Sequence, residues 1–244
     1  MIVLCDEVTC AVCGHTGQFP SIGHWEAEGA WGLDGRPPEP LFSHLELLVQ
    51  TCPDCEYSAD FVGLAAPGVS QIVRSDAYQA LRLSGEIPQG GLGFLLQAHI
   101  AESQGEIINA AWLHIHAAWQ FERYGNDLRS REHRLIAVDL LKRAALDNMD
   151  ACEKPGVVWL LCCDLLRRAG CLEEAREAAI LGLAMGPERD DETALRYELK
   201  LIDDGDRSFR DSWDAFGRPP SSGTTPVLYP EILRAWSNTN VLGR

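Results

Sequence analysis

Positive charge is almost absent from the first 70 residues of this chain of 244. Arg36 is the only basic residue there, against ten aspartates and glutamates, and the whole chain has a formal net charge of -15. Affinity for nucleic acid depends on lysine and arginine side chains that displace counterions from phosphates. A nucleic-acid-binding function is therefore disfavoured and ranks third among the functions considered below.

Long apolar runs are lacking as well. Residues 157–163 (VVWLLCC) are apolar but stop at Asp164, far short of the roughly 20 residues of a membrane helix. The opening MIVLCDEVTC reaches Asp6 and Glu7 before the apolar core of a signal peptide can form. We therefore expect a soluble, cytoplasmic protein without a membrane span.

The motifs of common catalytic sites are missing too. Neither GxSxG nor a zincin motif occurs, and the glycine-rich QGGLG lacks the strand before it and the lysine after it that define a phosphate loop. His114 and His116 are two apart in a predicted helix, so they point to separate faces, and we expect them at packing and surface positions. We predict no catalytic residue, and whether the protein is an enzyme stays open.

Cysteine, in contrast, is plentiful. Four of the nine cysteines form two CxxC pairs, in VTCAVCGH and TCPDCEY: Cys10, Cys13, Cys52 and Cys55. Gly14 follows the first pair and Pro53 lies inside the second, which suits tight turns whose backbone amides point at thiolate sulfur. Two such turns create one tetrahedral four-sulfur site, and zinc is the ion that most often fills it.

Other interpretations of the two pairs remain open. The thiols could be buried without a metal, or one pair could be a redox couple, although neither pair clearly follows a strand and opens a helix. His15, His24 and His44 could replace a cysteine, but with four thiols available we favour solvated or hydrogen-bonded histidines. Four thiolates close the coordination sphere, so the sequence predicts one structural zinc ion. The apolar stretches on both sides of the second pair indicate a hairpin that the metal would hold.

From Ser70 to about residue 203 the apolar residues follow a helical period. Residues 94–119 and 159–184 align with one another when Gly105 is set on Gly170. The alignment pairs large residues and small residues of the two segments: Phe94 with Trp159, Ala98 with Cys163, Ala110 with Ala175, and Ala117 with Gly182. Large anchors, small crossing residues and a glycine turn are typical of paired antiparallel helices. Trp159, Gly170, Ala175 and Pro187 stand at the spacing of a tetratricopeptide repeat.

The predicted fold is therefore mainly α, with a small β zinc-ribbon head followed by a tetratricopeptide-like helical-repeat array. We predict a zinc-ribbon domain over residues 1–69 and a helical domain over residues 70–210. Residues 211–244 would form a flexible tether and a short docking segment. That segment carries apolar side chains that could dock on the same chain or on a partner: Tyr229, Ile232, Leu233 and Trp236.

Several of these sequence motifs together resemble those of a bacterial family of uncharacterised proteins. That family joins a double-CxxC zinc ribbon to tetratricopeptide-like helices. The matching motifs, which lie within residues 8 to 200, are VTCAVCG, WGLDGRPPEP, TCPDCEYSA and the AAW helix. WGLDGRPPEP is similar to the family's Asp-Leu-Asp-x-Arg-Pro signature. Glu56 stands where the family has glycine, so the second turn departs from the pattern. The resemblance implies a fold but no activity.

The signature loop contains Asp34, Arg36 and Pro37. Arg36 could bind a carboxylate or phosphate, because it is the only cation in an acidic segment. A local pair of Asp34 with Arg36 that shapes the loop is the simpler interpretation, and we favour it.

The function favoured by the sequence is a non-enzymatic adaptor that binds a peptide or protein in the groove of the helical repeats. The first helix of each pair would line that groove and present four side chains: His99, Glu102, Asp164 and Arg167. The alternative is an enzyme, or an enzyme subunit, that uses the ribbon as a lid. Homo-oligomerisation is compatible with all of these functions.

Overall fold

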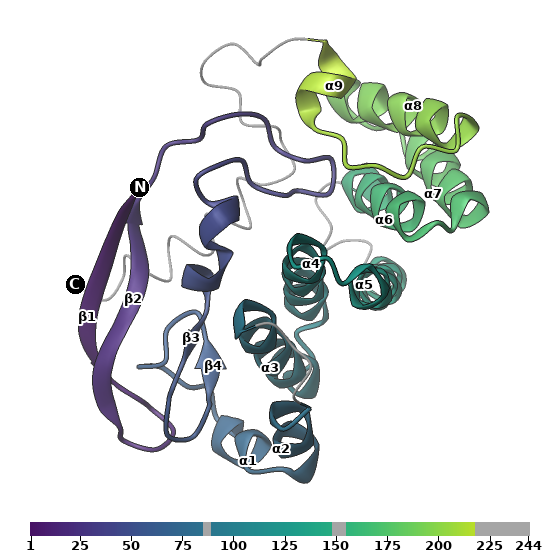
Figure 1. Ribbon diagram of the computed structural model, residues 1–244. Coiled ribbons are helices and arrows are strands. Elements are labelled where there is room, and N and C mark those ends of the chain that lie inside the picture. The colour runs from purple at the N-terminus through teal and green to yellow at the C-terminus, as the bar shows by residue number, and fades with distance from the viewer. Residues whose placement is uncertain (85–88, 148–154, 218–244) are drawn as a thin grey trace. The chain divides into compact units, whose positions relative to one another are not determined.

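The computed structural model describes residues 1–84, 89–147 and 155–217 (Figure 1). The fold is mainly helical with a small two-stranded sheet at the N-terminus, which confirms the predicted class at this level. These residues form two compact units. Residues 1–26 and 40–144 form unit 1, while residues 27–39 and those described from 145 onward form unit 2.

The β-structure of unit 1 consists of two small antiparallel pairs. β1 (Ile2–Thr9) pairs with β2 (Thr16–His24), and β3 (Gln50–Thr51) pairs with β4 (Ser58–Ala59). The 3-10 helix η1 (Phe42–Leu48) leads into β3. Each pair closes at one CxxC turn, because Cys10–Cys13 lies between β1 and β2 and Cys52–Cys55 lies between β3 and β4. The hairpin predicted around the second pair is therefore present, though with very short strands.

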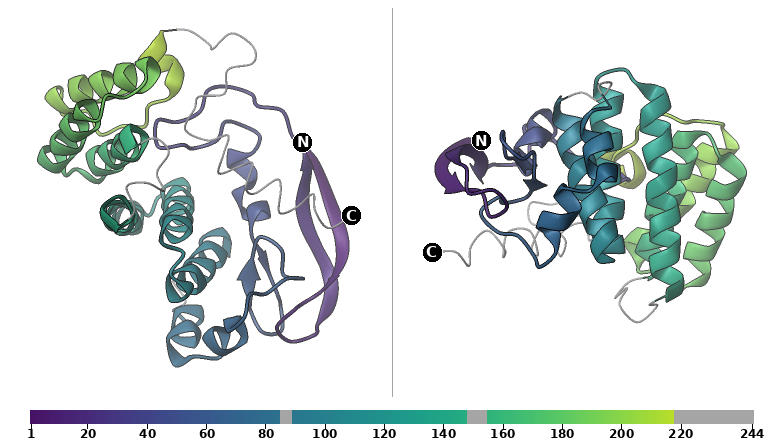
Figure 2. Two further views of the ribbon diagram at one scale, coloured as in Figure 1. Left: turned by 180° about the vertical axis from the view of Figure 1, so that it is seen from behind. Right: turned by 90° about the horizontal axis from the view of Figure 1, so that it is seen from below.

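Five helices complete unit 1: α1 (Val69–Val73), α2 (Asp76–Arg82), α3 (Gln89–Gln104), α4 (Ile107–Arg123) and α5 (Asp127–Asp147). α3 and α4 run side by side, which Figures 1 and 2 both show. Gly105 joins them at a φ of 78°, a value that glycine adopts without strain. A single hydrophobic core joins the two CxxC turns to α1, α2 and α3. Its buried residues include Val8, Phe19, Tyr57, Val62 and Leu96.

Unit 2 combines the loop of residues 27–39 with four helices: α6 (Pro155–Ala169), α7 (Leu172–Ala184), α8 (Arg189–Asp203) and α9 (Ser212–Phe216). The loop is held by backbone hydrogen bonds from Leu33 to the Arg210 carbonyl (3.1 Å) and from Ser212 to the Trp31 carbonyl (2.8 Å). Gly170 joins α6 to α7 at a φ of 82°.

The two segments aligned in the sequence each form a helical hairpin. Their turns share one hydrogen-bond pattern: Gly105 N–H donates to Glu102 O (3.1 Å), and Gly170 N–H donates to Arg167 O (2.9 Å). This pattern is a common way to end a helix, so it does not establish a repeat. The tetratricopeptide-like array stays a prediction.

The predicted domain limits at residues 69 and 210 also stay predictions. The tether beyond residue 217 and the docking segment around Trp236 lie outside the described residues. Among the helices that the structure describes, none combines the length and the apolar character needed to cross a membrane.

Candidate metal centre

The two CxxC turns bring four thiols together in unit 1. The Sγ atoms of Cys10, Cys13, Cys52 and Cys55 all lie within 4.8 Å of one another, so the four residues could bind one metal ion. The Sγ atoms of Cys10 and Cys55 are 3.7 Å apart, and those of Cys13 and Cys52 are 3.6 Å apart. Cys10 and Cys52 are buried, whereas Cys13 is exposed.

These distances fit a tetrahedral site. A zinc–sulfur bond of about 2.3 Å gives a sulfur–sulfur edge of roughly 3.8 Å in a regular tetrahedron, whereas a disulfide bond would need about 2.05 Å. Burial raises the pKa of the Cys52 and Cys55 thiols, and a bound cation would favour the thiolate form of each. With four thiolate ligands no position would remain open for a substrate.

The two turns share one backbone geometry. In the first, Cys10 N–H donates to His15 O (2.7 Å) and Gly14 N–H donates to Cys10 O (2.9 Å). In the second, Cys52 N–H donates to Tyr57 O (2.9 Å) and Glu56 N–H donates to Cys52 O (2.8 Å). Glu56 thus occupies the position of Gly14.

The three histidines considered as replacement ligands have other contacts. His15 Nδ1 lies 2.9 Å from Asp54 Oδ2, so this hydrogen bond joins the first turn to the second. His44 Nδ1 lies 2.9 Å from the Pro40 carbonyl, and His24 Nε2 lies 3.8 Å from Glu26. None of the three belongs to the thiol cluster.

Glu56 adopts strained backbone geometry. Among the described residues it is the one non-glycine with a positive φ, at 57°. Its carboxylate lies 3.1 Å from Arg82 Nη1, and its carbonyl accepts a hydrogen bond from the Tyr78 hydroxyl (2.8 Å). The departure from glycine noted in the sequence therefore falls at a residue that needs a left-handed conformation.

We expect Glu56→Gly to be more stable than Glu56→Ala by about 1 kcal/mol, because both variants lose the Arg82 pair but only glycine relieves the left-handed strain. Gly14→Ala should lower the free energy of unfolding by about 1 kcal/mol for the same reason. No atom lies within 4 Å of a Cβ at residue 14, so crowding adds nothing to that cost. Urea unfolding of the metal-loaded variants measures both differences. Equal stability of the two Glu56 variants would contradict the assignment of strain.

The signature loop is fixed by Asp34 within unit 2. Asp34 Oδ1 accepts a hydrogen bond from the Arg36 backbone N–H (3.1 Å), and Oδ2 accepts one from the Arg168 guanidinium. The Arg36 guanidinium carbon lies 3.2 Å from the centre of the Phe209 ring. Pro37 is buried. The pairing of Asp34 with Arg36 through the Arg36 backbone N–H is compatible with a loop-shaping role, which stays a prediction. The partners Arg168 and Phe209 were not predicted.

Two of the predicted partner-binding residues are in the interior, which corrects that prediction. Arg167 donates to Glu198 Oε2 (2.6 Å) and to Asp164 Oδ2 (2.7 Å), and all three side chains are at most 1% exposed. Side chains enclosed in this way cannot line an open groove. In unit 1, His99 is half-buried, and Glu102 is exposed but bonds His114.

A cluster of histidines in unit 1 was missed. His114 Nδ1 lies 3.0 Å from His133 Nδ1, and His114 Nε2 lies 3.1 Å from Glu102 Oε1. Burial lowers the pKa of His116 to about 3, so its ring is neutral at physiological pH. Both His114 and His116 are buried, which agrees with the expected packing positions and contradicts the expected surface position. The hydrogen-bond partners of His114 come from α5 and α3, so spacing along one helix could not reveal them.

Comparison with known proteins found no relative of this chain. The chain matches no protein-family model, no curated protein and no solved structure. The family resemblance therefore stays a prediction.

Proposed function

We propose that the protein is a non-enzymatic adaptor in which one structural zinc ion holds the two CxxC turns and strand β1 binds a partner protein. Four thiolates in a reducing, cytoplasmic setting would hold the ion, as the resemblance to zinc-ribbon proteins with tetratricopeptide-like helices also implies. The surface proposed for the partner replaces the helical groove, because Asp164 and Arg167 are buried.

The exposed apolar half of β1 carries this proposal. Ile2, Val3 and Leu4 have exposed fractions of 56%, 48% and 39%. β1 pairs only with β2 in a two-stranded sheet, so among the described residues its second edge faces no strand. Open edge strands with apolar side chains favour addition of another strand, because main-chain hydrogen bonds and side-chain burial then act together.

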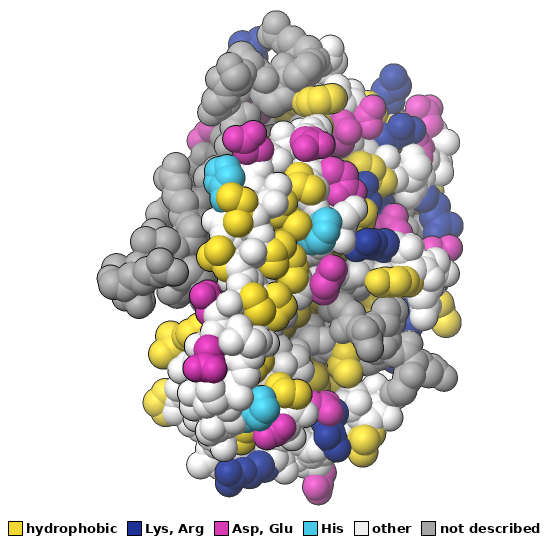
Figure 3. Space-filling view, turned by 60° about the vertical axis from the view of Figure 1, so that its left-hand side comes forward, with side chains coloured by type: hydrophobic (Ala, Val, Ile, Leu, Met, Phe, Trp, Pro, Cys, Tyr) yellow, Lys and Arg dark blue, Asp and Glu magenta, His cyan; other side chains and the backbone are white. Residues whose placement is uncertain are grey.

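The charge around β1 indicates the chemistry of the partner. Asp6 and Glu7 follow the apolar half, and Glu26 lies just beyond the end of β2. Figure 3 views the molecule with this side turned forward, and hydrophobic side chains gather there with acidic ones around them. An extended apolar segment flanked by lysine or arginine would complement both features. Nucleic acid stays disfavoured, because its phosphates would face these carboxylates.

The proposal predicts that positive charge on β1 weakens binding. A cross-linker attached to Cys5, which is exposed in the middle of β1, would capture and identify the partner in cells. The purified partner should then bind an Ile2→Lys/Val3→Lys variant at least about tenfold more weakly than wild type, a loss of ~1.4 kcal/mol. Calorimetric titration measures the two affinities.

The matched control is Leu128→Lys, which makes the same change at a leucine that is 76% exposed on another part of unit 1. It should leave the affinity within about twofold of wild type. Equal weakening by Leu128→Lys would mean a general charge effect. If the captured protein is a second copy of this chain, and light scattering shows a dimer that the β1 variant abolishes, the surface is a dimer interface and not an adaptor site.

A further inference from the structure

The thiol cluster of unit 1 is built from two equivalent turns, so it has two matching edges that join one turn to the other. The Sγ atoms of Cys13 and Cys52 form one edge (3.6 Å), and those of Cys10 and Cys55 form the other (3.7 Å). Because the turns are equivalent, the residues two positions after these cysteines lie beside the same edges. The side chains at those positions differ in polarity, so the two sides of the site are not alike.

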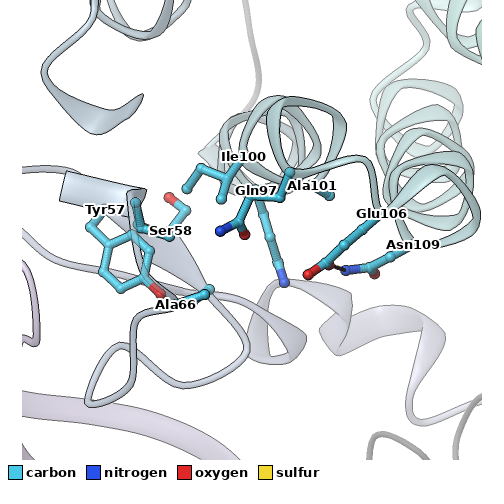
Figure 4. A pocket seen from close by; sticks show the side chains of 11 residues that line it. Tyr57, Ser58, Ala66, Gln97, Ile100, Ala101, Glu106 and Asn109 are labelled. Carbon is cyan, nitrogen blue, oxygen red and sulfur yellow. Dashed lines mark hydrogen bonds between the residues drawn. The ribbon is translucent and has the colours of Figure 1, made fainter. Parts of the chain in front are cut away.

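The edge formed by Cys10 and Cys55 is flanked by apolar packing. Val12 and Tyr57 come two positions after these cysteines, and both pack in the hydrophobic core. Tyr57 is 4% exposed, and its hydroxyl donates to the Leu64 carbonyl (2.6 Å). Figure 4 shows Tyr57 on the wall of a small pocket whose other wall is α3. Apolar side chains therefore limit the access of water to this side of the site.

The edge formed by Cys13 and Cys52 is flanked by a polar pair instead. His15 and Asp54 come two positions after these cysteines, and His15 Nδ1 lies 2.9 Å from Asp54 Oδ2. An ionised carboxylate only accepts hydrogen bonds, so His15 Nδ1 must be the donor. The two side chains are 26% and 62% exposed. Water therefore reaches this side of the site.

His15 is held in position from two sides. Its carbonyl accepts a hydrogen bond from Cys10 N–H (2.7 Å), and its ring lies over Gly17, where an added Cβ would be only 2.9 Å from His15 Nε2. The ring therefore reaches Asp54 from a fixed position. The hydrogen bond ties the end of the first turn to the second turn, which limits separation of the turns at the exposed edge.

Cys13 is the thiol of the cluster that differs in its surroundings. It is exposed, whereas Cys10 and Cys52 belong to the hydrophobic core and Cys55 packs against it. Exchange of an ion held by four thiolates requires one thiolate to leave as another ligand enters. Cys13 can leave without opening the core, because its side chain is not part of that core.

We propose that metal is exchanged at the edge formed by Cys13 and Cys52, and that His15 and Asp54 are positioning residues that slow this exchange. Cys13 is the ligand that an incoming thiol or chelator replaces first. The hydrogen bond from His15 to Asp54 keeps the two turns together and returns Cys13 to its place. This inference rests on the metal centre of the proposed function and not on the partner of β1.

The first test measures the release of zinc from the full-length, zinc-loaded protein to an excess of the chromophoric chelator pyridylazoresorcinol. The release rate should rise with the chelator concentration, because the chelator reaches the site at the exposed edge. Asp54→Ala should release zinc about fivefold faster than wild type, since the hydrogen bond is lost. The matched control Asp6→Ala removes the same charge from an exposed position on β1 and should change the rate less than about 1.5-fold.

Conservative variants separate the hydrogen bond from the charge. Asp54→Asn removes the charge but keeps an oxygen that can accept from His15, so its release rate should stay close to that of wild type. His15→Asn keeps a side-chain N–H donor and His15→Ala does not, so only the alanine variant should release zinc faster. Gly17→Ala keeps both partners but displaces the His15 ring, and it should also accelerate release. The His15 variants test the same hydrogen bond if Asp54→Ala fails to fold.

Alkylation identifies the thiol that leaves first. With zinc bound, iodoacetamide should modify Cys13 at least about fivefold faster than the other three thiols of the cluster. In this reaction the sulfur displaces iodide and forms a thioether. Mass spectrometry of the peptides measures the four rates, in a Cys5→Ser background because Cys5 is also exposed. Asp54→Ala should raise the rate at Cys13.

Three results would overturn the proposal: a release rate that does not depend on the chelator concentration, equal release rates for Asp54→Ala and Asp6→Ala, or equal alkylation of the four thiols. A protein that binds no metal would overturn the zinc ion of the proposed function together with this inference. The β1 variant Ile2→Lys/Val3→Lys should release zinc at the wild-type rate, so failure of the β1 partner and failure of this proposal are distinguishable.

Discussion

Replacement of Cys52 by serine is expected to unfold the N-terminal part of unit 1 and to lower its free energy of unfolding by about 4 kcal/mol or more. Cys52 is 0% exposed and belongs to the core cluster that also contains Val8, Phe19 and Tyr57. β1 pairs only with β2, and β3 and β4 have two residues each, so hydrogen bonds alone would hold these strands weakly. The metal would then supply most of the energy that keeps the two turns together.

Hydrogen exchange measures where the loss occurs. Backbone amides of residues 2–24 and 50–62 should exchange at least about 100-fold faster in Cys52→Ser, while those of α6 to α8 in unit 2 should not change. A zinc chelator should give the same pattern in the wild-type protein. Cys5→Ser is the matched control, because Cys5 is an exposed cysteine of β1 outside the thiol cluster. Unchanged exchange after complete removal of the metal would show that the turns do not depend on it.

The cluster of four thiols could be predicted, because each CxxC turn is a local sequence pattern. Each CxxC turn needs two cysteines at fixed spacing and a residue in a left-handed conformation; Gly14 marks that position in the first turn, whereas Glu56 in the second gives no such signal. Glycine likewise marks the α3–α4 and α6–α7 turns at Gly105 and Gly170. Short-range patterns of this kind are compatible with few local conformations, so they can be recognised in a single sequence.

The contacts that the sequence did not reveal are non-local. Asp34 and Arg168 are 134 positions apart, and nothing in either neighbourhood indicates the other. Asp164 and Arg167 were expected on an open groove, because they lie on the first helix of a predicted repeat and charged side chains are usually exposed. They can be buried because Glu198 on α8 supplies a second carboxylate to Arg167.

Replacement of Arg167 by methionine is expected to destabilise unit 2 by about 3–5 kcal/mol. The buried Glu198 carboxyl group would lose its cation, and Asp164 would keep only Arg168, whose Nη1 lies 3.9 Å from Asp164 Oδ1. Besides Asp164 and Glu198, Arg167 also donates to the carbonyls of Asp206 (2.9 Å) and Ser208 (2.8 Å), which would lose that donor. Arg176→Met is the matched control, because Arg176 forms a half-exposed pair with Asp203 at 2.6 Å. Its expected cost is within about 0.5 kcal/mol.

The penalty of Arg167→Met should depend on pH in a defined direction. Burial already raises the pKa of Asp164 and of Glu198 in the wild-type protein, and loss of the Arg167 charge would raise both further. A folded state with raised carboxyl pKa values binds more protons than the unfolded chain, so its stability grows as the pH falls. The penalty should therefore be smaller at pH 5.5 than at pH 8, whereas the effect of Arg176→Met should not change. Urea unfolding at both pH values measures this, and a penalty below about 1 kcal/mol at pH 8 would mean that Arg167 is not needed to neutralise the two carboxyl groups.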